Sequence, residues 1–115
     1  MVGIASQRKG KAGELELMSI LRENGFSVQR GGSLSYGKLP DVYGLPGVHI
    51  EVKYREKMNP SGFMRQSMTD SQKFHDGMPA VFYTQNGKDW QVAMNLSDWI
   101  YLYKKANIES DVNWI

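Results

Sequence analysis

Hydrophobic residues recur at helical spacing in three parts of the chain, with strand-like runs between them. The first helical pattern covers residues 10–24 and stops at Gly25, which is typical of a C-terminal cap. A second helix is predicted from residue 59 to about residue 75, because Asn59 and Pro60 fit an N-cap and the first helical position. The stretch from Thr69 to Gln72 also fits a capping box, so one kinked helix and two short helices both stay open.

A third helix is predicted near the end of the chain, with Asn95 or Ser97 as its N-cap. We expect its apolar stripe to pack back on the sheet. The tail, residues 107–115, is weakly specified and is a candidate to pair with a second subunit. The residues of the stripe are Leu96, Trp99, Ile100 and Tyr103.

Five short strands are predicted between these helices. Residues 26–30 form the first, residues 41–44 and 48–54 form a hairpin, and residues 79–85 and 88–94 form a second hairpin. Asn86 and Gly87 favour a type I′ turn in the second hairpin. Residues 31–38 contain three glycines and two serines, which indicates a mobile loop. The predicted order is therefore α-β-β-β-α-β-β-α.

The turn of the first hairpin decides which side chains share a face. A two-residue turn at Pro46 and Gly47 would put Asp41 opposite Val52, whereas a three-residue turn puts Asp41 opposite Glu51. A trans Pro-Gly pair suits the mirror-image turns of two-residue hairpins poorly. We therefore expect the three-residue turn, or an equivalent bulge, with both carboxylates on one face.

Length and composition narrow the class of protein. A chain of 115 residues with 41% hydrophobic and 23% charged residues is expected to fold as a single domain, residues 1–115. The absence of cysteine excludes disulfides, thiolate metal sites and a cysteine nucleophile, so any metal ion must be held by oxygen or histidine. No apolar run is long enough to span a membrane, and we expect a cytoplasmic protein of a bacterial, archaeal or phage-infected cell.

Glu14 is out of place in the first helix. It lies three, four and seven positions before Leu17, Met18 and Leu21, so it projects along the core-facing stripe. A carboxylate there needs a partner, which a metal-bound water or a second ion would supply. The alternative is that Glu14 only interacts favourably with the helix dipole near the N-terminus.

Asp41, Glu51 and Lys53 together indicate metal-dependent phosphodiester hydrolysis. The two carboxylates are suited to hold Mg²⁺ together with the backbone carbonyl of Val52 and water, and we expect Mn²⁺ to substitute. The ion would offset phosphate charge, while Lys53 would orient or deprotonate the attacking water. His49 shares this face, but one histidine without a spaced partner does not predict a ligand. Simple polar-out alternation is the alternative explanation of the strand.

Basic and polar residues around this site are candidates for DNA binding. The net charge is only +2, so the distribution of charge matters more than its total. Tyr36 in the glycine-rich loop is suited to stack on a base, although a plain flexible connection is the alternative for that loop. The basic clusters are suited to follow phosphates, and a solvated basic face is the alternative. The predicted set is Arg8, Lys9, Lys11, Arg30, Ser35, Tyr36, Lys38, Arg55 and Lys57.

The sequence Pro40-Asp41 followed by Glu51-Val52-Lys53 resembles the signature of PD-(D/E)xK nucleases. Residues 8–55 resemble archaeal-type Holliday junction resolvases more specifically, and the later half resembles small phage-encoded nucleases. The resemblance implies an α/β, restriction-endonuclease-like fold: an αβββαβ core with a mixed central sheet flanked by helices, then an extra strand and helix. It also implies catalytic roles for Glu14, Asp41, Glu51 and Lys53, for Ser33 or its rival Ser35 in the loop, and for Gln66 or else Gln72 in the following helix.

The predicted function is a Mg²⁺-dependent DNA endonuclease that selects branched structures, as Holliday junction resolvases do. We expect a homodimer, because cutting two strands needs two sites, with no membrane partner and no small-molecule cofactor. Two alternatives stay open. One is a nicking or restriction-like phage nuclease acting on duplex or flapped DNA, and the other is a non-catalytic nucleic-acid-binding module. The complete set of site residues favours an enzyme.

Overall fold

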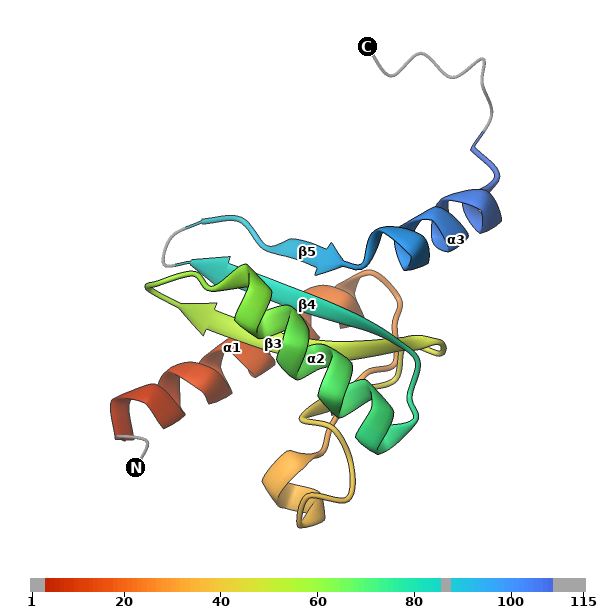
Figure 1. Cartoon of the computed structure of the whole chain (residues 1–115). Coiled ribbons are helices and arrows are strands. Elements are labelled where there is room, and N and C mark those ends of the chain that lie inside the picture. Colours follow the sequence, from red (N-terminus) through yellow and green to blue (C-terminus); the bar gives the residue numbers. More distant parts are fainter. Residues whose placement is uncertain (1–3, 86–87, 109–115) are drawn as a thin grey trace.

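A five-stranded mixed sheet with helices on both faces forms the body of the protein (Figure 1). The computed structural model describes residues 4–85 and 88–108. The helices are α1 (Ile4–Glu23), α2 (Pro60–Phe74) and α3 (Leu96–Ala106), with a short 3-10 helix η1 (Gly32–Ser35). The strands are β1 (Gln29–Arg30), β2 (Val42–Tyr43), β3 (Val48–Arg55), β4 (Met78–Gln85) and β5 (Gln91–Met94).

The sheet has the order β1-β2-β3-β4-β5. The strands β3 and β4 pair in parallel, and the other neighbours are antiparallel. The helix α2 joins the two parallel strands and packs on them, while α1 lies on the other face of the sheet (Figure 1). This arrangement confirms the predicted fold class and the predicted order of elements.

The first hairpin has the expected register. Val42 pairs with Ile50, and the amide of Val48 donates to the carbonyl of Leu45 at 3.0 Å. The same register, carried one residue outward, places Asp41 opposite Glu51. The expected register is therefore confirmed.

The Leu45–Val48 hydrogen bond closes a β-turn over Pro46 and Gly47, so the odd register comes from one extra residue between Val42 and Leu45, where Gly44 has a φ of +124°. This is the predicted bulge rather than a three-residue turn.

The helix α2 is a single helix. The side chain of Asn59 accepts a hydrogen bond from the amide of Gly62 at 3.2 Å, and Pro60 occupies the first turn, as predicted. The helix continues to Phe74 and ends at His75, which adopts a left-handed conformation. A restart at residues 69–72 is therefore excluded.

Several boundaries differ from the predicted ones. The helix α1 begins at Ile4 rather than at residue 10, because Gly10 is tolerated inside the helix at a cost of about 1 kcal/mol. The first strand contains only Gln29 and Arg30, since its partner β2 is equally short. Phe26, predicted in that strand, is half exposed. The second hairpin is confirmed by the pairing of β4 with β5, whereas its turn at residues 86–87 lies outside the described residues.

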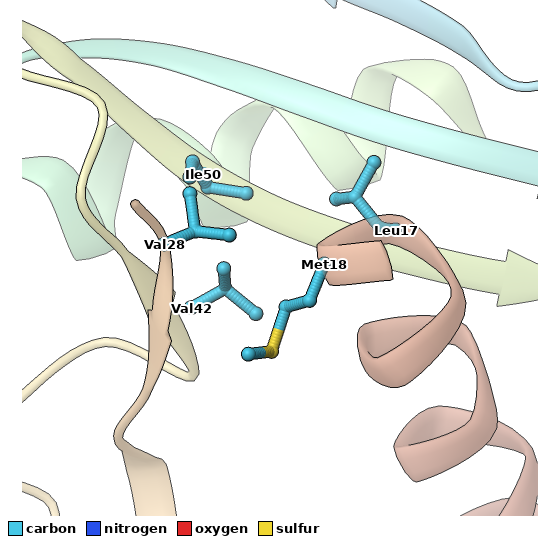
Figure 2. Close-up of a cluster of buried hydrophobic side chains, with 5 residues drawn as sticks. All are labelled: Leu17, Met18, Val28, Val42 and Ile50. Carbon is cyan, nitrogen blue, oxygen red and sulfur yellow. The ribbon is translucent and has the colours of Figure 1, made fainter. Parts of the chain in front are cut away.

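The hydrophobic core lies between α1 and the β1–β3 part of the sheet (Figure 2). Burial of each such aliphatic side chain contributes roughly 1.5–3 kcal/mol. Gly13 lets α1 approach β3 closely, because a Cβ at this position would lie 2.8 Å from the Cβ of Tyr54. The five core residues are Leu17, Met18, Val28, Val42 and Ile50.

The helix α3 does not pack back on the sheet, so that prediction is wrong. None of its eleven residues is buried, and Trp99 is 50% exposed. It extends away from the sheet edge beyond β5 (Figure 1). The four residues of the predicted stripe, Leu96, Trp99, Ile100 and Tyr103, are all exposed, and only Asn95 separates α3 from β5. Most of the tail, from residue 109, lies outside the described residues.

No helix among the described residues is long and apolar enough to cross a membrane.

Candidate active site

Asp41 is held at the start of β2 by the loop that precedes it. Its carbonyl accepts a hydrogen bond from the amide of Gly31 at 3.0 Å. Gly32 has a φ of +56°, and a Cβ at this position would overlap the Asp41 carboxylate. Glycine is therefore required there for two reasons, the backbone conformation and the space taken by the carboxylate.

The polar face of β3 is buried. His49 is 1% exposed, and Glu51 and Lys53 are each 6% exposed. Simple polar-out alternation is therefore wrong for this strand, because α2 covers the face that carries these three residues. Buried charges of this kind need partners, and each of the three has one.

Lys53 lies between an amide and a carboxylate. Its Nζ donates to Gln66 Oε1 at 2.6 Å and lies 3.5 Å from Glu51 Oε2. Gln66, rather than the fallback Gln72, is thus the glutamine of α2 at the site. The amine is fixed by two contacts with its side chain only 8% exposed.

Glu14 reaches the site from α1, with its side chain 17% exposed. Arg30 donates to it at 3.2 Å. Burial and the neighbouring charge of Asp41 raise the pKa of Glu14 above its ordinary value, Arg30 opposes this, and Glu51 adds to it. The carboxylates of Glu14, Asp41 and Glu51 are therefore close enough to repel one another.

His49 lies at the centre of the site, although its sequence context gave no reason to include it. Its Nε2 lies 3.2 Å from Glu51 Oε1, and its Nδ1 lies 2.8 Å from Asp76 Oδ2. Burial opposes the charged imidazolium, but the hydrogen bonds to Glu51 and Asp76 outweigh burial and raise the pKa of His49. Asp76 is 27 residues away in sequence, which explains why no spaced motif was visible.

A cleft of about 520 Å³ opens beside these side chains. Asp41, His49 and Glu51 line it from the sheet, and Asp70 and Lys73 line it from α2. The sequence did not predict that Asp70 and Lys73 line this cleft, because charged residues at these positions are typical of the exposed face of any helix. The loop that carries η1 supplies the opposite wall with Gly32, Tyr36, Gly37, Leu39 and Pro40.

The predicted DNA-binding residues fall into three groups. Lys11, Tyr36, Lys38, Arg55 and Lys57 are exposed, with Tyr36 93% exposed at the cleft. The others are engaged within the protein: Arg30 with Glu14, Lys9 weakly with Glu56 at 4.0 Å, and Ser35 with Gly32 and Leu39 in its own loop. The side chain of Arg8 lies outside the described part of the structure, as does that of Ser33, the serine predicted to be catalytic.

The chain is similar to known junction-cleaving proteins. Residues 5–97 match the sequence model of a family described as archaeal Holliday junction resolvase. The solved structure of Hjc from Archaeoglobus fulgidus, a Holliday junction resolvase, superposes with a TM-score of 0.51 at 24% sequence identity. That match covers 70% of this chain and 72% of the other, and it supports the fold alone. No curated protein matches the chain.

Proposed function

The chain belongs to the archaeal Holliday junction resolvase family, and we propose that Glu14, Asp41, Glu51 and Lys53 are the residues with which it cleaves DNA. Members of this family are metal-dependent endonucleases that act on branched DNA, and this chain is one of them. The observation that carries the proposed site is the register of the first hairpin, which brings Asp41 opposite Glu51 beside the fixed amine of Lys53.

The residues present suit Mg²⁺. Asp41 and Glu51 both raise the pKa of Glu14, so a cation among the three carboxylates would relieve their repulsion. Asp41 and Glu51 would hold the ion directly, together with the Val52 carbonyl, and Glu14 would act through water or a second ion. Mg²⁺ prefers oxygen ligands, and Mn²⁺ also binds them. When bound, the ion supplies positive charge at the phosphate and makes water more acidic.

The protein's own residues then position the reactants. Gln66 and Glu51 hold the Lys53 amine next to the Glu51 carboxylate, which lines the cleft. There the amine would orient the attacking water and offset charge on the scissile phosphate. Arg30 would keep Glu14 in place through its 3.2 Å ion pair. Buried, hydrogen-bonded side chains need little rearrangement when charge develops, which favours the transition state.

DNA would enter along the open side of the cleft. Tyr36, which is almost fully exposed on the loop after η1, would stack on an unpaired base at a branch point. Lys38, which is exposed on the same loop, and Lys73, which lines the cleft from α2, would contact phosphates. Such contacts follow backbone shape rather than a base code, which agrees with selection of branched structures.

We also propose a homodimer, in which a second copy covers α3. Trp99 and Tyr103 stack on one another at 5.1 Å between ring centroids, and both are about half exposed. Ile100 adds a third exposed apolar side chain to this helix. Apolar residues concentrated on one unburied helix are typical of a protein–protein contact. Two copies would bring two active sites to the two strands of one junction.

A cleavage panel tests this function. The protein with Mg²⁺ should cut a four-way junction faster than flapped, nicked or linear DNA of the same sequence. Equal cleavage of linear duplex would favour a nicking or restriction-like nuclease instead. Binding without cleavage of any substrate, in Mg²⁺ or Mn²⁺, would favour the non-catalytic module and contradict the proposal.

A further inference from the structure

A second group of candidate metal ligands lies beside Glu51 in the same cleft. His49, Glu51 and Asp70 each offer one ligand atom, and these atoms all lie within 4.8 Å of one another. The proposed catalytic set leaves His49 and Asp70 without a role. We propose that His49 Nε2 and the carboxylates of Glu51 and Asp70 bind a divalent transition-metal ion, separate from the Mg²⁺ held by Asp41 and Glu51 and from any ion beside Glu14.

His49 is held in the way that metal-binding histidines are held. Its Nδ1 lies 2.9 and 2.8 Å from the two carboxylate oxygens of Asp76. The ring also stacks on Phe74, with 6.4 Å between centroids and 10° between planes. Metal-binding histidines commonly donate the outer N–H to a carboxylate, which fixes the tautomer and the ring orientation. With Nδ1 donating to Asp76, Nε2 is the nitrogen directed at Glu51.

The spacing of the atoms fits a shared ion. Bonds of about 2.1 Å to one octahedral ion place two neighbouring ligand atoms about 3.0 Å apart. His49 Nε2 and Glu51 Oε1 are 3.2 Å apart. Asp70 is half-buried and lines the cleft from α2, so a rotation of its side chain would bring its carboxylate into the same shell.

The nitrogen ligand determines which ions this site prefers. Imidazole binds first-row transition ions better than Mg²⁺, which prefers oxygen alone. Glu51 would be shared, because its Oε1 faces His49 while its Oε2 faces Lys53 at 3.5 Å. Two ions near one phosphate are a common arrangement in nucleases. The inference rests on the proposed function only through this shared carboxylate.

Mn²⁺ alone, added to the DNA-free protein, tests the site by pulsed electron paramagnetic resonance. A nitrogen bound directly to Mn²⁺ gives a hyperfine modulation that oxygen ligands do not give. The chain has two histidines, so the source of a signal can be assigned. We expect the modulation in the wild type and in His75→Asn, which keeps the left-handed cap, and its loss in His49→Gln.

Two milder variants keep the test decisive if His49→Gln fails to fold. Asp70→Asn should weaken Mn²⁺ binding at least about tenfold by calorimetry, and Asp76→Asn should weaken it by about 10–100-fold. Asp89→Asn, an exposed carboxylate away from the cleft, should have no effect. Mn²⁺-loaded wild type without nitrogen modulation would overturn the proposal, as would equal affinity in Asp70→Asn and Asp89→Asn.

The same experiment separates this inference from the catalytic assignment. Asp41→Asn should keep the nitrogen modulation while losing cleavage. Cleavage lost in Asp41→Asn, with no modulation in the wild type, would overturn the second site alone. Modulation in the wild type, with cleavage kept in Asp41→Asn, would overturn the catalytic assignment alone.

Discussion

Replacing Gln66 with alanine should slow cleavage far more than it destabilises the fold. The amide accepts from Lys53 Nζ at 2.6 Å, and hydrogen bonds to charged groups contribute about 1.5–3 kcal/mol. Gln66 itself is exposed, so water replaces the lost acceptor and the cost should fall at the lower end, about 1.5 kcal/mol. Water does not fix the direction of the amine, and a misplacement of about 1 Å costs on the order of 100-fold in rate.

Two measurements on matched variants check this expectation. Urea unfolding, followed by the fluorescence of the three tryptophans, gives the change in free energy of unfolding. Single-turnover cleavage of a four-way junction gives the rate, which should fall by about 10–100-fold. Gln72→Ala makes the same change six residues along α2 at an exposed position, and should leave stability within about 0.5 kcal/mol and the rate unchanged. Equal rates for Gln66→Ala and Gln72→Ala would refute the reasoning.

Three further predictions follow from the site and from α3. The pKa of Glu14 is raised because its charged form is disfavoured in the folded protein. Glu14→Gln should therefore increase the free energy of unfolding of the metal-free protein at pH 7, measured by urea unfolding. This increase should disappear as the pH falls through the raised pKa toward 4, because Glu14 is then uncharged in the wild type as well. Gly32→Ala and Gly37→Ala both place alanine at positive φ, which costs about 1 kcal/mol of stability in each variant. Only the methyl group of Gly32→Ala would collide with the Asp41 carboxylate. Only this variant should therefore lose Mg²⁺-dependent cleavage, by at least about tenfold. Trp99→Asp should convert a dimer to a monomer in sedimentation velocity, and a monomeric wild type would contradict the dimer.

The sequence was sufficient for those parts of the site that depend on local geometry. The pairing of Asp41 with Glu51 was predicted because a trans Pro46-Gly47 sequence suits a tight two-residue hairpin poorly, and this argument uses eleven consecutive residues. The structure reaches the same register with one extra residue before the turn, where Gly44 has a positive φ. Glu14 was predicted as a site residue because it is a carboxylate on the otherwise apolar face of its helix. In both cases, residues close in sequence determine the geometry.

The parts that sequence reasoning missed depend on contacts between distant segments. Asp76 reaches His49 only because α2 crosses over and β4 returns beside β3, which pairs His49 with Pro79 in parallel. The cleft-facing position of Asp70 depends on how α2 is rotated on the sheet. The apolar stripe of α3 was visible, but a stripe does not specify whether the surface that covers it belongs to the same chain or to another.

Cleavage and binding by Asp41→Asn, measured on one four-way junction, test the central claim most directly. Asparagine keeps the shape of the side chain but removes the charge that a divalent ion needs. Cleavage in Mg²⁺ should fall by at least about 1,000-fold, while the affinity for the junction in Ca²⁺ should stay within about threefold of the wild type. In the control Asp89→Asn, the cleavage rate and the affinity should both stay within about threefold of the wild type. An Asp41→Asn protein that cleaves at the wild-type rate would contradict the assignment of the active site.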